Sequence, residues 1–346
     1  MVTRVTNFRI AKPVSVFETT IRVLGGLLSA HMYATELLGP RHQDQLLSLA
    51  IDLADRLVPA FNTATGIPFN TISLSSGVPQ HETPVTCLAC LGSLTLEFGT
   101  VSRLMGNPLY HHLAKRAVVA AWKLRTTIGL MGCHINAQSG QWTEHAASIS
   151  GTSDSYYEYV CKAAVMFDDP EYAYLCQVTY ETVENQLRYK DWYASASIWN
   201  GIIYRSSFES LQAFWPGLQV LLGDLKPAIR SVRQYIQLLD RFAFLPEAVN
   251  MDRLTALVGR EGYPLRPELV ESLMALFQAT QDRRLLNVAT EQIRRLLAYC
   301  WTSCGFANVK DVRHLILEDQ MDSFFLAETL KYLYLLFTPG HPLHHD

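Results

Sequence analysis

Apolar residues recur along this chain at every third or fourth position, which is the spacing of one face of an α-helix. Glycine, proline or aspartate interrupts the pattern at nearly every junction, as in "MGNP", "FDDP" and "LGDLKP". The pattern predicts about eleven helices. They are expected at residues 14–35, 43–60, 84–105, 108–126, 152–167, 170–188, 208–222, 225–241, 266–280, 283–299 and 321–337.

The stretches between the helices alternate polar and apolar residues instead, as in "TGIPFNTISL" and "GLMGCHINAQSGQW". Ser139 and Gly140 lie at the centre of the second stretch, which predicts a small β-hairpin. Long helices that pair antiparallel, joined by tight turns on one side and longer loops on the other, indicate an all-α toroid of helical hairpins. Because no linker of biased composition divides the chain, residues 1–346 are expected to form one domain.

Composition narrows the class of protein. A hydrophobic content of 49% and a net charge of −3 describe a globular chain, and the absence of basic runs argues against a nucleic-acid partner. The longest apolar stretches, such as "YLYLLF", are far shorter than the ~20 residues of a membrane span, so no transmembrane segment is expected. The first ten residues lack the apolar core of a signal peptide, which taken literally predicts the cytosol.

Seven cysteines, an odd number, suit a mostly reduced protein or one with at least one spare thiol. Cys87 and Cys90 form a CxxC motif, and Cys300 and Cys304 form a wider pair. A zinc site would require both pairs to converge, and a redox site would require a strand followed by a helix, which "TPVTCLACLGSLTLEF" does not suggest. We therefore favour two small buried residues on a helix for the CxxC pair.

Acidic residues stand at unexpected places in otherwise apolar helices. In "LRPELVESL", Glu268 and Glu271 are three residues apart and share a helical face just after Pro267. Each acid has an ordinary explanation: stabilisation of a helix dipole, a structural ion pair or a helix cap. The same situation recurs in four more segments, around Glu18 with Arg22, Glu97, Asp154 with Glu158, and Phe324 with Glu328.

Five such segments are harder to explain singly, because buried acids are rare without a reason. In a ring of helices the acids could converge on a central cavity. Carboxylates flanked by aromatic rings suit a glycosidase, in which one acid protonates the leaving oxygen, another activates water and the rings stack on sugar.

Long segments of the chain resemble the class I α-mannosidases of glycoside hydrolase family 47, in particular the ER degradation-enhancing α-mannosidase-like proteins. The resemblance runs through "VSVFETTIRVLGGLLSAH", "LEFGTVSRLMGNP", "DSYYEY", "FWPGLQ", "EGYPLRPELVESL" and "MDSFFLAETLKYLYLLF". It implies an (α/α)7 barrel that hydrolyses terminal α-1,2-linked mannose from N-glycans with inversion, and a bound Ca²⁺.

The resemblance also implies roles for individual residues. Glu18 matches the general acid, which acts through a water, Asp154 matches a second catalytic carboxylate and Glu268 matches the general base. Arg266 is expected beside Glu268, where its charge would hold the carboxyl ionised. Residues expected to bind substrate are Arg22, Glu97, Arg266, Glu271, Phe324 and Glu328.

The two ends of the chain depart from the family. The helix that contains Glu18 begins only about fifteen residues into the chain, so we expect the first hairpin of the barrel to be absent and the domain to be incomplete at its N-terminus through a truncated gene model. Completing it would restore the ER lumen as the location. At the C-terminus, "LLFTPGHPLHHD" stands where the family has a "TEGHPL"-like stretch whose threonine binds the ion. Thr338 is the candidate calcium ligand, with weakened binding expected, and a simple helix end is the alternative.

The expected partners are high-mannose N-glycans on misfolded glycoproteins, in ER-associated degradation, together with an oxidoreductase as a candidate. A non-catalytic mannose-binding adaptor for misfolded glycoproteins is the alternative function. Retention of the three catalytic carboxylates argues against the adaptor, and the altered ends of the chain argue for it. A helical protein with no glycan role is a third, less favoured option.

Overall fold

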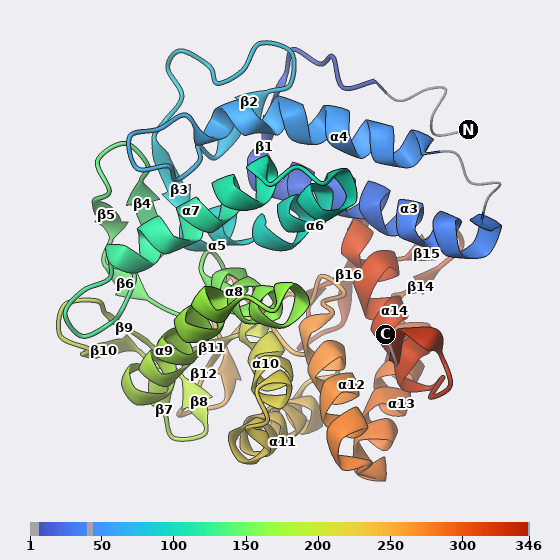
Figure 1. The fold of residues 1–346 in the computed structure, drawn as a ribbon. Helices are drawn as coiled ribbons and strands as arrows, with labels where there is room; N and C mark the ends of the chain where they lie inside the picture. The colour runs from blue at the N-terminus through green and yellow to red at the C-terminus, as the bar shows by residue number, and fades with distance from the viewer. Residues whose placement is uncertain (1–6, 40–43, 345–346) are drawn as a thin grey trace. The chain divides into compact units, whose positions relative to one another are not determined.

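The computed structural model describes residues 7–39 and 44–344. By its internal contacts the chain divides into two compact units. The first comprises Met1–Ser148, Thr152–Gln186 and Ala196–Ile202, and the second comprises Ile149–Gly151, Leu187–Ser195 and Ile203–Asp346. Each unit is built mainly from helices that pair as antiparallel neighbours, with short strands in the loops (Figure 1).

The first unit holds three helical hairpins, formed by α3 with α4, α6 with α7, and α8 with α9. Its elements are β1 (Pro13–Ser15), α2 (Val16–Glu18), the π-helical turn η1 (Thr19–Leu24), α3 (Gly25–Leu38), α4 (Gln45–Leu57), η3 (Val58–Phe61), β2 (Thr71–Ser73), β3 (Val85–Cys87), α5 (Leu88–Gly92), α6 (Thr95–Met105), α7 (Leu109–Lys123), β4 (His134–Asn136), β5 (Trp142–Glu144), β6 (Ala146–Ala147), α8 (Asp154–Phe167), α9 (Pro170–Gln186) and all but the first residue of β9 (Ser195–Ser197).

Two hairpins, α10 with α11 and α12 with α13, dominate the second unit. Its elements are β7 (Arg188–Tyr189), β8 (Trp192–Tyr193), β10 (Ile203–Arg205), β11 (Ser207–Glu209), η4 (Ser210–Phe214), α10 (Trp215–Leu221), α11 (Leu225–Arg241), β12 (Ala248–Asn250), β13 (Thr255–Ala256), α12 (Glu268–Thr280), α13 (Arg283–Arg295), the π-helical turn η5 (Leu296–Cys300), β14 (Trp301–Thr302), β15 (Gly305–Phe306), β16 (Asn308–Asp311), β17 (Ile316–Glu318), the π-helical turn η6 (Phe325–Thr329), α14 (Leu330–Leu336) and η7 (Pro342–His344).

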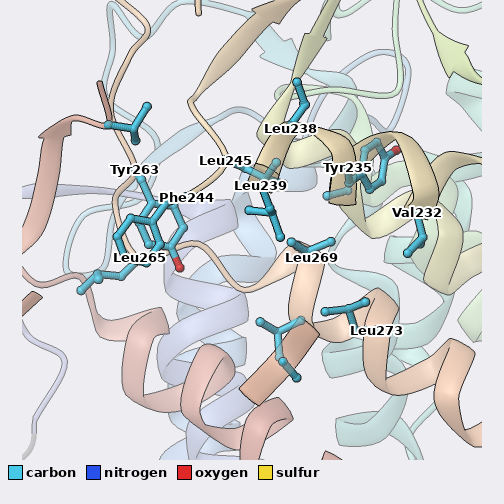
Figure 2. Close-up of a cluster of buried hydrophobic side chains, with 14 of the residues drawn as sticks. Val232, Tyr235, Leu238, Leu239, Phe244, Leu245, Tyr263, Leu265, Leu269 and Leu273 are labelled. Carbon is cyan, nitrogen blue, oxygen red and sulfur yellow. The ribbon is translucent and has the colours of Figure 1, made fainter. Parts of the chain in front are cut away.

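Helical periodicity explains how each unit builds its core. Helix α7 buries Ala114, Ala117, Val118 and Ala121, which follow one another at three- and four-residue steps on one face. In the second unit, Val232 and Tyr235 of α11 and Leu269 and Leu273 of α12 belong to one buried cluster (Figure 2). The rings of Phe244 and Tyr263 stack in the same cluster, with centroids 4.5 Å apart and planes 3° from parallel. This cluster fixes the start of α12.

Most predicted helices are present, and the predicted hairpin at Ser139 and Gly140 is confirmed. Strands β4 and β5 pair antiparallel across that turn, and Gly140 has the positive φ of 72° that a glycine tolerates best. The helix predicted at 84–105 is wrong in its first part, because β3 pairs with β4 before α5 and α6 begin. Helix α5 also packs closely on α8: a Cβ on Gly92 would lie 2.6 Å from the Tyr156 ring.

The prediction for the CxxC motif is wrong. Cys87 ends strand β3, Cys90 lies on α5, and a disulfide joins them, so the motif has the strand-to-helix setting that its sequence did not suggest. A second disulfide, between Cys161 and Cys176, ties α8 to α9. Within the described residues three cysteines are free, namely Cys133, Cys300 and Cys304, which confirms the expectation of at least one spare thiol. No helix in the described ranges is long and apolar enough to span a membrane.

Candidate active site

The first unit places Glu18 at the end of α2, where the chain turns into the π-helical segment η1. Ser15 caps this helix, and its Oγ accepts a hydrogen bond from the Glu18 amide at 3.2 Å. Nε of Arg22 donates to Oε2 of Glu18 at 2.5 Å, and the two side chains are 42% and 47% exposed. π-Helical turns occur frequently at functional sites, because they re-aim side chains that a regular helix would direct elsewhere.

Glu97 lies on α6, which contacts both the η1 turn and α8. Its Oε1 accepts a hydrogen bond from the Tyr159 hydroxyl at 3.0 Å, whereas Oε2 is enclosed without a partner among the described residues. Burial raises the pKa of Glu97 to about 7, although the Tyr159 bond and the charge of Lys162 partly oppose the rise. Glu97 is therefore an acid that can hold or release a proton near neutral pH.

Asp154 is the first residue of α8, with Ser153 at the cap position before it. This placement overturns the alternative in which Asp154 is the N-cap itself. Oδ1 of Asp154 accepts a hydrogen bond from the Ser155 amide at 2.9 Å. Two residues earlier, Thr152 has a φ of 73°, which is strained for a β-branched residue, and its carbonyl accepts from the Ala89 amide at 2.8 Å. Strained backbone beside a half-buried carboxylate is characteristic of functional sites.

In the second unit, Glu268 is the first residue of α12. Its Oε2 is enclosed and has no hydrogen-bond partner within residues 7–39 and 44–344. Burial raises the pKa of Glu268 to about 8; the Arg266 charge lowers it, and the nearby carboxyls of Glu328 and Glu271 raise it further. The prediction that Arg266 holds Glu268 ionised is therefore wrong, because burial outweighs the attraction of that guanidinium.

Arg266 instead makes a two-pronged ion pair with Glu247. Its Nε lies 2.8 Å from Oε1 of Glu247, and its Nη2 lies 2.9 Å from Oε2. The same guanidinium lies 5.7 Å from the ring centre of Phe324, as a cation placed over an aromatic ring. Because the charge of Arg266 is largely neutralised by Glu247, Arg266 lowers the pKa of Glu268 less than an unpaired guanidinium would.

Sequence reasoning missed Glu247. Burial opposes its ionisation, but the hydrogen bonds and charge of Arg266 more than offset that, so the pKa of Glu247 is lowered. Ser210 donates a further hydrogen bond to its Oε1 at 2.9 Å. In the sequence Glu247 lies in "LPEAVN", a loop and short strand without helical periodicity, so the search for acids in apolar helices could not find it.

The remaining candidates of this unit gather around the start of α12. The hydroxyl of Tyr332 lies 3.4 Å from Oε1 of Glu271. Glu328 lies on the π-helical turn η6, just after Phe324. Thr329, the last residue of that turn, donates to the carbonyl of Leu265 at 2.7 Å and so ties η6 to the loop that precedes Glu268. The structure thus brings Arg266, Glu268, Glu271, Phe324 and Glu328 together.

Thr338 lies away from this group. It follows α14, and its hydroxyl donates to the Tyr334 carbonyl at 2.8 Å, as at an ordinary helix end. The carbonyl of Thr338 lies 3.0 Å from Nε2 of His344, whose Nδ1 lies 2.6 Å from Nε2 of Gln278. Gln278 is ten residues along α12 from Glu268, which is about 15 Å at 1.5 Å per residue. Thr338 therefore belongs to the opposite end of α12 from the candidate acids.

Comparison with known proteins identifies the family of this chain. The sequence model described as "Glycosyl hydrolase family 47" matches residues 1–346. The chain is 46% identical over 335 residues to "Alpha-mannosidase I MNS4" of Arabidopsis thaliana, which covers 96% of this chain and 54% of that protein. It is 41% identical over 345 residues to "ER degradation-enhancing alpha-mannosidase-like protein 2" of Homo sapiens, covering 98% of this chain and 60% of that protein. The chain thus spans little more than half the length of these relatives.

Solved structures of similar fold support the same family. An α-1,2-mannosidase from Trichoderma reesei matches 97% of this chain and 80% of its own, with a TM-score of 0.84 and 26% sequence identity. A D-mannose isomerase matches with a TM-score of 0.73 at 11% identity, which is a likeness of fold alone. The predicted fold class, an all-α fold of the (α/α)7 type with small β-hairpins in its loops, is confirmed.

Proposed function

Because the chain belongs to glycosyl hydrolase family 47, we propose that it is a glycosidase that removes terminal α-1,2-linked mannose from high-mannose N-glycans. The observation that carries the proposal is the placement of the predicted acids. Asp154 and Glu268 each open a helix, and Glu18 closes the short helix α2. Glu97 and Glu268 have pKa values of about 7 and about 8, within the range where general acids and bases operate.

In the proposed reaction the chain uses an inverting mechanism. Glu18, acting through a water, protonates the glycosidic oxygen as the bond to the leaving sugar breaks. Glu268 removes a proton from the water that attacks the opposite face of the mannose ring. Asp154 is the second carboxylate that stabilises the charge developing on the ring. Arg22, Glu97, Arg266, Glu271, Phe324 and Glu328 are proposed to bind the sugar hydroxyls and the ring face.

The proposed setting is the lumen of the endoplasmic reticulum, where misfolded glycoproteins would supply the glycan. Two observations support it. One relative is named for enhancement of ER degradation. In addition, two disulfides, Cys87–Cys90 and Cys161–Cys176, suit an oxidising compartment. An oxidoreductase partner stays a prediction.

The calcium ion implied by the family does not fit Thr338 as the structure places it. The hydroxyl of Thr338 is engaged at a helix end, and the described residues include no group of three or more histidine, cysteine, aspartate or glutamate side chains that could hold a metal. We therefore assign no step to the ion, and calcium binding stays a prediction.

One assay tests the proposal. The chain is incubated with a high-mannose glycan, with and without Ca²⁺, and released mannose is measured together with the anomer first formed. Release of β-mannose from the α-linked substrate is expected, since inversion converts one anomer into the other. Absence of mannose under both conditions would exclude the proposed activity.

The adaptor function is favoured by one observation. A carboxyl whose pKa is about 8 is mostly protonated at neutral pH, and in that form it can donate a hydrogen bond to a sugar hydroxyl. An adaptor would bind the glycan with the same affinity before and after long incubation and release no mannose. A glycan-binding measurement run beside the mannose assay separates the two functions.

A further inference from the structure

Two residues that line the same small cavity in the second unit each carry an enclosed polar atom. One such atom is Oε2 of Glu268, and the other is Nε2 of Gln292 on α13; neither has a hydrogen-bond partner in the described part of the chain. Gln292 is only 5% exposed. The remaining lining is provided by Ser210, Leu245, Tyr263, Arg266, Leu269 and Val270. Figure 2 shows Leu245, Tyr263 and Leu269 in the buried hydrophobic cluster of this unit.

These two atoms have complementary chemistry. The amide nitrogen of Gln292 has two hydrogens to donate, and a carboxylate oxygen only accepts. Leaving either group buried without a partner is unfavourable, because the group loses its hydrogen bonds to water and gains none in return. The cavity has room for about one water molecule, and a water can accept from the amide while it donates to the carboxylate. Ser210 offers a third contact, because its hydroxyl donates to Glu247 while the hydroxyl oxygen can still accept a hydrogen bond.

We propose that Gln292 is a positioning residue for Glu268 and acts through one water molecule held in this cavity. The amide of Gln292 donates to the water, and the water donates to Oε2 of Glu268. This holds one carboxylate oxygen in place and leaves Oε1 for the reaction. The inference rests on the proposed function, in which Glu268 is the general base.

The neighbours of the cavity favour water over a cation. The amide of Gln292 offers hydrogens and not lone pairs, and the positive charge of Arg266, which also lines the cavity, would repel a cation. Leu245, Leu269 and Val270, which also line the cavity, are buried apolar residues and offer no competing hydrogen bond to the water.

The proposed hydrogen bond also changes the titration of Glu268. The groups that face its carboxyl are Arg266, which lowers the pKa, and Glu271 and Glu328, which raise it, with Tyr263 beside it as a neutral phenol. A hydrogen bond donated to the ionised form favours that form and lowers the pKa. Gln292 would thus lower the pKa of Glu268 from the high value set by burial, so that a larger fraction of the carboxyl is ionised at neutral pH.

The test compares the whole chain with Gln292→Met, which keeps the length of the side chain and removes the donor. Gln219→Met is the matched control, because Gln219 is also fully buried in this unit but does not line the cavity. The titration of Glu268 is followed by carbon NMR of chains labelled at the glutamate carboxyl, with the signal assigned from Glu268→Gln. The pKa should rise by roughly one unit in Gln292→Met and stay unchanged in Gln219→Met.

A high-resolution crystal structure supplies the second measurement and needs no variant. Density for a water within about 3.2 Å of both Nε2 of Gln292 and Oε2 of Glu268 is expected. An unchanged Glu268 titration in Gln292→Met, equal shifts in both variants, or a cavity without that water would each overturn the inference. None of these readouts depends on turnover, so the inference can fail while mannose release succeeds, and the reverse.

Discussion

Arg266 and Glu247 form a two-pronged ion pair whose side chains are 22% and 21% exposed, next to the start of the helix that carries Glu268.

We expect Glu247→Gln to destabilise the fold by roughly 2–4 kcal/mol at pH 7, because it leaves the Arg266 charge partly buried without its partner. The measurement is urea unfolding of the two chains. Glu291→Gln is the control: its ion pair with Arg295 lies on one helix with Glu291 46% exposed, and its loss should change stability by less than about 1 kcal/mol. Equal losses in both variants would contradict the expectation.

The sequence predicted the helices well and the environment of the acids less well. Periodicity located both ends of α11, and the start of α9, to the residue, because each helix buries a regular apolar face. It could not indicate that Cys87 ends a strand, since that strand is only three residues long and exists through pairing with β4. Pairing with β4 gives Val85–Cys87 a strand conformation although the local sequence pattern is helical.

The same contrast holds for the candidate site. Glu18, Glu97, Asp154 and Glu268 were found as acids in apolar segments, and the structure places each at or near a helix end or a partly buried face. The partner of Arg266 was not found. Glu247 is nineteen residues away along the chain, in a segment without regular periodicity, and only the folded chain brings the two side chains together.

Glu268→Gln tests the assignment of the general base. The substitution keeps the shape of the side chain and removes its ability to take a proton, so mannose release should fall by at least ~10². Glycan affinity should change little, because the amide still offers hydrogen bonds to a sugar. Rates are measured under single-turnover conditions with excess protein. A Glu268→Gln variant as fast as the parent would exclude Glu268 as the base.

The buried acids should make stability depend on pH. Burial raises the pKa of Glu97 to about 7 and that of Glu268 to about 8, above the ordinary value of a glutamate in the unfolded chain. The folded chain therefore binds these protons more tightly, and the free energy of unfolding should fall as pH rises from about 5 to about 8. Glu247 acts in the opposite sense: its lowered pKa gives stability that is lost on acidification below about 4.

Melting temperatures of the parent and Glu268→Gln at pH 5 and pH 8 check this dependence. The substitution should raise the melting temperature at pH 8, where the parent must bury a charge, and change it less at pH 5. A melting temperature that is raised equally at both values would attribute the effect to packing rather than ionisation.

The two disulfides should differ in their contribution to stability. Cys161 and Cys176 are fifteen residues apart, whereas Cys87 and Cys90 are three apart. Loop-closure entropy then predicts that the free energy of unfolding falls by about 3 kcal/mol when Cys161 and Cys176 are both replaced by alanine. It should fall by about 2 kcal/mol when Cys87 and Cys90 are replaced. Urea unfolding without reductant measures both. A larger loss from Cys87 and Cys90 would indicate that their disulfide stabilises the folded state through contacts, for example by holding α5 against α8.

Calcium binding should not depend on Thr338. In the structure the Thr338 hydroxyl donates to the Tyr334 carbonyl, and the segment after it contacts Gln278, at the far end of α12 from Glu268. Ca²⁺ takes six to eight oxygen ligands, most of which water and sugar hydroxyls can supply, so binding could persist without this threonine but should be weak. Thr338→Ala removes the hydroxyl at small cost, because the residue lies at the exposed end of a helix.

Isothermal titration calorimetry with Ca²⁺ should give the same weak affinity for the parent and for Thr338→Ala. Thr280→Ala is the matched control, because the Thr280 hydroxyl also donates to a carbonyl one turn earlier, that of Leu276 at 2.7 Å, at the end of a helix. The control separates loss of a calcium ligand from loss of a helix-end hydrogen bond, since both variants lose the latter. Tight binding that Thr338→Ala abolishes and Thr280→Ala leaves intact would show that Thr338 reaches the ion, and the prediction would then be wrong.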